Sequence, residues 1–137
     1  SLNAKFKRLS GQANANFMTS NSSITSIEIA ESLPSNFTPS SDNIISTSGS
    51  QVPVYAWYDN PGIIYIYSDA RETKANGDLS YLAFKMGGLK SVDGFSNWNT
   101  SSTTTMAAMF TDASSLVDIS GMSTWDTSNV SNMHDMF

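Results

Sequence analysis

A 27-residue repeat near the C-terminal end limits the folds of this chain more than any other feature of the sequence. Nine positions carry the same residue in both copies, without a gap. They are Leu89, Gly94, Ser96, Trp98, Thr100, Ser101, Met106, Met109 and Phe110, which recur as Leu116, Gly121, Ser123, Trp125, Thr127, Ser128, Met133, Met136 and Phe137. A period between about 20 and 50 residues is typical of solenoids, in which each unit stacks on the next. The sequence therefore predicts a solenoid in this part of the chain.

A degenerate unit precedes the two full repeats. One further step of 27 residues places Leu79 and Leu82 at two of the methionine positions, and Phe84 falls one residue after the phenylalanine position. We expect a half-repeat over residues 79–88 and repeats over 89–115 and 116–137. Because about three repeats are normally needed for a stable stack, we expect residues 1–78 to cap its N-terminal end and further repeats to follow the second.

Each repeat is predicted to hold one strand and one short helix. Leu116–Ile119 has the apolar residues of a short strand, which would pair in parallel with Leu89–Val92. Val130, Met133 and Phe137 follow the i, i+3, i+7 spacing of one face of a two-turn helix. A strand and helix of this size cannot bury their apolar faces alone, so neighbouring units must share one core.

The first repeat departs from the pattern where its helix is expected to begin. Asn99 stands where the second repeat has Asp126, and Thr103 stands where it has Val130. Asp126 and the two residues after it have side chains that can accept hydrogen bonds from the first N–H groups of a helix. We therefore expect the first repeat to be the more poorly packed of the two.

Residues 1–78 are predicted to begin with a helix and to continue as a β-rich cap. Leu2, Phe6 and Leu9 have the spacing of an amphipathic helix, and Gly11 is a typical stop signal after it. Apolar residues then alternate with polar ones over Ile24–Ile29, which indicates a strand.

A β-hairpin is the clearest local prediction in this region. Val52–Tyr58 and Ile63–Tyr67 are rich in β-branched and aromatic residues, and Asp59–Gly62 between them contains a proline and a glycine. Pro53 indicates that the first strand begins at an edge of its sheet, because proline cannot donate to a neighbouring strand. Large residues on both sides of the strands suggest that both faces are covered. Ile44–Ile45 indicates a further strand.

Four aromatic residues of this hairpin are the candidate ligand-binding residues. Strand side chains alternate between faces, so Tyr55 and Trp57 share one face of the first strand, while Tyr65 and Tyr67 share one face of the second. Aromatic side chains on an open face would form a binding patch.

Other residues that suggest chemistry have simpler structural explanations. His134 is the only histidine, and it stands at a repeat position that we expect to face solvent, which argues against a Ser-His-Asp triad. Trp98 and Trp125 share one repeat position, so core packing explains them better than stacking on sugars. The repeated methionines are likewise a core stripe rather than a cofactor site.

Two sets of carboxylates are candidates for catalytic groups or metal ligands. Asp59, Asp69, Glu72 and Asp78 cluster in the sequence and could serve glycoside hydrolysis, but turn formation explains most of them. Asp112, Asp118 and Asp126 do not form a calcium-binding loop. We therefore predict no catalytic centre, no metal site and no cofactor.

The charge balance disfavours several classes of partner. Seven Lys and Arg residues stand against twelve Asp and Glu, for a net charge of −5, and no basic cluster is long enough to neutralise a phosphate backbone. Nucleic acid and anionic membranes are thus unlikely partners on charge alone, and no apolar stretch approaches the roughly 20 residues of a membrane span. The absence of cysteine excludes disulfides and thiolate sites.

The second repeat resembles the repeat of BspA-like bacterial surface proteins and Mycoplasma-type lipoproteins. The resemblance rests on Leu116, Ile119, the run Trp125-Asp126-Thr127-Ser128-Asn129-Val130, and Met133, Met136 and Phe137. The segment from Tyr55 to Leu89 resembles, more weakly, the region that often precedes such repeats. The resemblance implies a leucine-rich-repeat-like solenoid on a bacterial cell surface, with a role in adhesion or protein binding.

Together these features predict an α+β protein, with a β-rich cap that carries a hairpin followed by a short strand-and-helix solenoid. The expected function is a non-enzymatic interaction module, extracellular or on the cell surface, whose partner is a host or bacterial surface protein. The alternatives are a carbohydrate-binding module, or an accessory part of a glycan-active surface protein, and a stalk that displays another domain.

Overall fold

The chain folds into one α-helix, five short strands and three turns of 3-10 helix. The computed structural model describes all residues from Ser1 to Phe137. The elements in chain order are α1 (Leu2–Leu9), β1 (Ser26–Ile29), η1 (Ser41–Asn43), β2 (Val54–Asp59), β3 (Ile63–Ser68), β4 (Thr73–Lys74), η2 (Asp93–Phe95), β5 (Trp98–Asn99) and η3 (Ser120–Met122). The protein is therefore of mixed α and β content, with small sheets.

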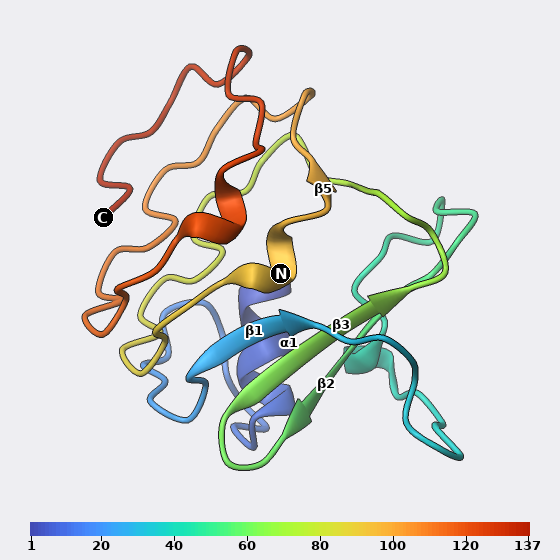
Figure 1. The fold of residues 1–137 in the computed structure, drawn as a ribbon. Coiled ribbons are helices and arrows are strands. Elements are labelled where there is room, and N and C mark those ends of the chain that lie inside the picture. The colour runs from blue at the N-terminus through green and yellow to red at the C-terminus, as the bar shows by residue number, and fades with distance from the viewer.

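Helix α1 confirms the amphipathic segment that the sequence predicts. Ser1 caps it, because its Oγ accepts a hydrogen bond from the backbone N–H of Ala4. Phe6 is fully buried in the core, and Gly11 follows the helix with a φ of 110°, a conformation that favours glycine. Figure 1 shows α1 behind the three-stranded sheet.

The predicted hairpin forms the main sheet together with β1. The strand order is β1-β3-β2, with β1 parallel and β2 antiparallel to β3, so β2 lies at an edge as Pro53 indicates. Gly62 does not have a positive φ; a glycine is needed here because Thr25 leaves no room for a side chain. A Cβ atom at this position would lie 2.3 Å from Oγ1 of Thr25, in the segment that leads into β1.

The strand expected at Ile44–Ile45 is wrong in extent. Ile44 makes a single bridge to Tyr55, and the preceding residues form η1 instead. The side chain of Asn43 accepts hydrogen bonds from the backbone N–H and the hydroxyl of Ser40, and it donates to the carbonyl of Ala56. Such local bonds from a side chain compete with a strand ladder.

The repeats extend the sheet sideways by single bridges rather than by full strands. Ser26 of β1 pairs in parallel with Ser91, which pairs in parallel with Asp118. The predicted parallel pairing of Leu116–Ile119 with Leu89–Val92 is therefore right in direction, although each segment contributes one bridge and no strand. Consequently, β1 supports the first repeat as that repeat supports the second.

A second series of contacts joins residues 78–86, 105–111 and 132–136, which lie side by side as successive turns in Figure 1. Alternate backbone N–H groups of each segment donate to carbonyl oxygens of the next. The bonds run from Leu79, Tyr81, Ala83 and Lys85 to Thr105, Ala107, Met109 and Thr111, and from Met106, Ala108 and Phe110 to Asn132, His134 and Met136.

The helix predicted in each repeat is wrong. Asp135 has a φ of 53°, and the equivalent residues of the earlier turns, Ala108 and Tyr81, have φ values of 53° and 66°. A right-handed helix cannot pass through this left-handed conformation. Asn132 also accepts a hydrogen bond from the N–H of His134, which closes a local turn. Turns stacked on their neighbours thus satisfy the backbone groups that a helix would have satisfied internally.

The packing of the two repeats is opposite to the prediction. Trp98 and Met109 of the first repeat are buried, whereas Trp125 and Met136 of the second are half-buried. Thr103, expected to weaken the first repeat, is fully buried and donates its hydroxyl to the carbonyl of Asn76. The first repeat is covered by a layer on each side. Within residues 1–137, the second repeat pairs with the first.

The repeated glycine is explained by the close approach of successive layers. At Gly94 a Cβ atom would lie 2.7 Å from Cγ2 of Ile27, and at Gly121 it would lie 2.7 Å from Cα of Asp93. No Cβ fits at either distance without a shift of the layer beneath. Each glycine therefore lets one turn sit directly on the backbone of the previous one.

We expect Gly94→Ala to lower the free energy of unfolding by about 1–3 kcal/mol, because the added methyl group overpacks this contact. Urea unfolding followed by circular dichroism measures the loss. Gly49→Ala is the matched control: no atom lies within 4 Å of its added Cβ, so a change below about 0.5 kcal/mol is expected. Equal losses in both variants would contradict the close approach of the layers.

Candidate functional site

The four aromatic residues predicted as a candidate site lie together on one face of the sheet. Tyr55 pairs with Tyr67 across β2 and β3, and Trp57 pairs with Tyr65. Paired residues of neighbouring strands point to the same side, and the rings of Trp57 and Tyr65 are 5.9 Å apart between centroids. We call this set of Tyr55, Trp57, Tyr65 and Tyr67 the aromatic face.

The opposite face of the hairpin fixes this orientation. Val54, Ala56, Ile64 and Ile66 alternate with the aromatic residues and are buried in the main core. A slip of one residue in either strand would place apolar residues in solvent and rings in the core. All four residues of the aromatic face are half-buried, so the predicted cover of both faces is complete on the core side and partial on this one.

Phe37 completes the aromatic face and was missed by the sequence analysis. It comes from the segment after β1, and its ring centroid lies 5.8 Å from that of Tyr55 and 5.5 Å from that of Trp57. The segment leaves the sheet through a hydrogen bond from Ala30 N–H to the carbonyl of Ile66. A single aromatic residue in a polar loop gives no periodic signal, so only the structure could place it.

Carboxylates border the aromatic face. Glu28 of β1 pairs with Tyr65 and therefore lies on the same side of the sheet, and Asp59 follows Trp57 by two residues in β2. Asp69 accepts a hydrogen bond of 2.7 Å from the hydroxyl of Tyr67. This bond raises the pKa of Tyr67 above its usual value, because it favours the protonated hydroxyl.

The other two tryptophans pack within the stack. Trp98 and Trp125 lie 6.4 Å apart with an interplanar angle of 5°. The Nε1 atom of Trp125 donates to the carbonyl of Phe95 at 2.9 Å. Core packing is therefore confirmed for Trp98, which is 6% exposed, and Trp125 covers it from the next layer.

The remaining polar candidates each contact a different partner, and they do not form a cluster. His134 is exposed, and its Nε2 atom lies 3.2 Å from a carboxylate oxygen of Asp135. Glu72 accepts a hydrogen bond from the side chain of Asn99, and Asp78 accepts one from the N–H of Ser80. No group of three or more His, Asp or Glu side chains is placed to hold a metal ion.

A pocket of about 290 Å³ lies between α1 and the start of β2 and was not predicted. Its walls include Leu2, Val54, Thr73, Lys74 and Trp98. The buried indole N–H of Trp98 has no hydrogen-bond partner. No sequence signal could have found this pocket, because its walls come from four separate segments.

In the segments that follow Gly77, parallel bridges and residues with a left-handed backbone recur at intervals of 27 residues. Residues 78–137 match the family described as Mycoplasma protein of unknown function, DUF285. The DUF285 match spans the half-repeat and both repeats, and it leaves the aromatic face outside. Comparison with curated proteins and with solved structures found no match. No helix of the protein is both long and apolar enough to cross a membrane.

Proposed function

We propose that this chain is a non-enzymatic interaction module of a bacterial surface protein, and that it binds a host or bacterial surface protein through the aromatic face. In this proposal residues 79–137 are a leucine-rich-repeat-like solenoid of the BspA kind, and residues 1–78 are its cap. The DUF285 match over residues 78–137 is consistent with this origin.

The proposed solenoid is supported by bonds that repeat with the period of the sequence. Asp78, Thr105 and Asn132 are joined by parallel bridges and are each 27 residues apart. Side chains follow the same interval, because the hydroxyl of Thr104 donates to the carbonyl of Gly77 and the hydroxyl of Ser131 donates to that of Thr104. These bonds join each turn to the next along the stack, as in repeat proteins.

The observation that carries the proposed binding role is the half-buried aromatic face. Its rings are held in register by β2 and β3, and the opposite side of the hairpin is anchored in the core. A site on paired strands loses little conformational freedom when a partner binds. Trp and Tyr side chains are also the residues that most often contribute the largest share of binding energy at interfaces.

The double substitution Trp57→Leu with Tyr65→Leu tests this role. We expect it to weaken binding to immobilised extracellular-matrix proteins by at least about tenfold, because it removes two neighbouring rings of the aromatic face. Phe137→Leu is the control, since it changes an aromatic residue that is 71% exposed and lies outside the aromatic face. Surface plasmon resonance gives the affinities. Unchanged binding by the double variant, with its fold intact by circular dichroism, would rule out the aromatic face as the site.

Carbohydrate binding is the second candidate, because Trp57 is not buried and its ring could stack on a sugar. A glycan panel titrated against the tryptophan fluorescence separates the two. A response that disappears with Trp57→Leu but persists with Trp125→Leu would favour a glycan partner. A flat response to every glycan would remove this candidate.

A further inference from the structure

The aromatic face carries negative charge that nothing in the molecule neutralises. Glu28, Asp59 and Asp69 border it, and none of them forms a salt bridge. The carboxylates that lie within 4 Å of a basic group are Asp42, which pairs with Arg8, and Asp135, which lies beside His134. No Lys or Arg occurs between residues 9 and 70. The face thus combines the negative side of aromatic rings with carboxylates that form no salt bridge.

Four of the chain's seven cations, Lys5, Lys7, Arg8 and Lys85, have contacts away from the aromatic face. Lys5 donates to the carbonyl of Ile44, and Lys7 donates to the carbonyls of Phe17 and Phe84. Lys85 lies 5.8 Å from the ring centroid of Phe84, so one aromatic ring of the protein already has an internal cation above it. No such pair occurs on the aromatic face.

Both edges of the sheet are occupied, which limits how a partner can reach it. On the β2 side, Ile44 bridges Tyr55, and the N–H of Ile45 donates to the carbonyl of Val54. On the β1 side, the N–H of Ile27 donates to the carbonyl of Ser91. A partner strand therefore has little free backbone to pair with, and the side chains of the aromatic face are the surface that remains.

We infer that the aromatic face binds a basic segment of a protein partner, whose guanidinium or ammonium groups stack on the rings and are neutralised by Glu28, Asp59 and Asp69. This inference rests on the proposed function and names the chemistry of its partner. A guanidinium group suits the face better than an ammonium group. It is planar, stacks on aromatic rings and binds carboxylates through a fork of N–H donors.

A short peptide of alternating arginine and threonine is the probe, and the same peptide with citrulline in place of arginine is its neutral counterpart. Citrulline keeps the planar shape and removes the charge. We expect the arginine peptide to bind with a change in tryptophan fluorescence and the citrulline peptide to bind at least about tenfold more weakly. Binding should also weaken as salt is raised, because the carboxylates lie at the surface.

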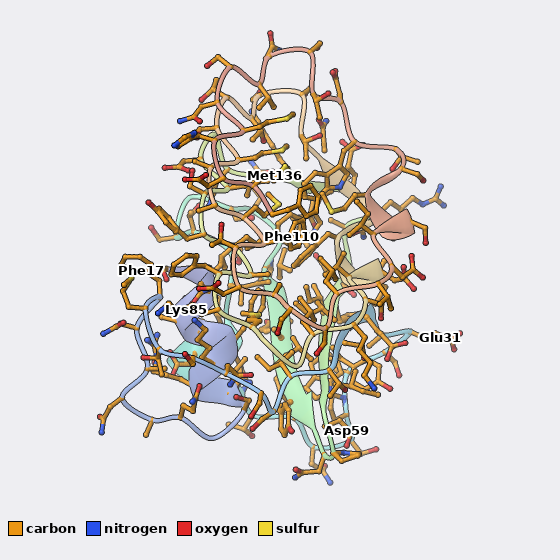
Figure 2. All side chains as sticks on the ribbon, turned by 90° about the vertical axis from the view of Figure 1, so that its left-hand side faces the viewer. Phe17, Glu31, Asp59, Lys85, Phe110 and Met136 are labelled. Atoms are coloured by element: carbon orange, nitrogen blue, oxygen red, sulfur yellow. The ribbon has the colours of Figure 1, made fainter.

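Two triple variants distinguish binding at the aromatic face from a non-specific attraction of the peptide to an acidic protein. Glu28→Gln, Asp59→Asn and Asp69→Asn together should weaken the arginine peptide by about tenfold. Asp78→Asn, Asp112→Asn and Asp135→Asn remove the same charge from the stacked turns and should leave the affinity within about twofold. In Figure 2, Asp59 lies at the lower end of the molecule, and Met136, the residue after Asp135, lies in its upper half.

The outcomes distinguish this inference from the proposed function. Equal affinity for the two peptides, no binding of the arginine peptide, or equal losses in the two triple variants would overturn the basic partner. If Trp57→Leu with Tyr65→Leu still abolished binding to matrix proteins or a neutral glycan in those cases, the aromatic face would stand as the site with a different partner. If that double variant had no effect on any probe, both proposals would fail.

Discussion

Replacing Phe110 with alanine should lower the free energy of unfolding by about 3–5 kcal/mol, which is typical of a phenylalanine removed from a packed core. Phe110 is 2% exposed and belongs to the main hydrophobic cluster. Its backbone N–H also bonds the carbonyl of Met136 in the next layer. Loss of the side chain leaves a cavity between two turns. Backbone hydrogen bonds hold these turns in place, so the cavity cannot easily collapse.

Phe137→Ala provides a control with the same residue at the same repeat position. Phe137 is 71% exposed and stacks on Phe110 at 5.6 Å between ring centroids. We expect its loss to cost below about 1 kcal/mol, because little apolar area is buried. Urea unfolding of both variants gives the comparison. Equal losses would contradict the difference in burial between the two layers.

The contrast between these two residues explains why the sequence misjudged the repeats. A pattern in the sequence reports which positions face the core, but it does not report how many layers lie above and below. The first repeat has the poorer match to the motif and the better burial, since it lies between β1 and the second repeat. Burial in a stack depends on neighbours, and a single unit does not encode them.

The helix prediction failed because its signal is shared by another structure. Apolar residues spaced three and four apart fit one face of a helix, but here tight turns bury the same positions, such as Met106 and Met109. Asn132 and the left-handed Asp135 select the turns. The hairpin was predicted correctly, by contrast, because adjacent strands joined by three residues need no distant partner to specify their register.

The aromatic face was predictable in part for the same reason. Alternation within β2 and β3 places Tyr55 with Trp57 and Tyr65 with Tyr67, and cross-strand pairing then joins the two pairs. To predict that Phe37 joins this face, one would have to know the path of the loop after β1. The position of Glu28 beside Tyr65 required the parallel pairing of β1 with β3, which joins segments more than 30 residues apart in the chain.

A buried lysine leads to the second large effect, a dependence of stability on pH. Lys7 is fully buried, and its Nζ atom donates to the carbonyls of Phe17 at 2.9 Å and Phe84 at 2.8 Å. Burial, assisted by the charge of Lys85, lowers the pKa of Lys7 from 10.5 to about 8. The other charged groups of α1 are Lys5 and Arg8, the second of which is paired with Asp42.

The unfolded chain therefore binds the Lys7 proton more tightly than the folded protein does. Below pH 8 both states are protonated and the folded protein carries the full cost of the buried charge. Between about pH 8 and 10.5 the folded protein is neutral at Lys7 while the unfolded chain is still charged, so stability rises with pH. The slope for one proton is at most about 1.4 kcal/mol per pH unit.

Lys7→Met isolates this effect, because methionine has a similar volume and no charge. We expect the stability of the wild type relative to this variant to increase from pH 8 to pH 10, measured by urea unfolding at each pH. Near pH 10 the wild type should be the more stable by about 1–3 kcal/mol, since the variant leaves two carbonyl groups without their donor. Parallel curves for the two proteins would show that Lys7 keeps an ordinary pKa and that its amino group reaches water.

The effect of Tyr67 on the pH dependence of stability must be distinguished from that of Lys7. Tyr67, whose pKa is raised by its bond to Asp69, holds its proton longer in the folded protein, so stability falls above pH 10. Its effect is opposite in sign to that of Lys7, and Tyr67→Phe removes it. Lys74→Met is the control for loss of an exposed lysine. A rise between pH 8 and 10 that survives Tyr67→Phe and disappears only with Lys7→Met would assign it to the amino group that joins α1 to the carbonyls of Phe17 and Phe84.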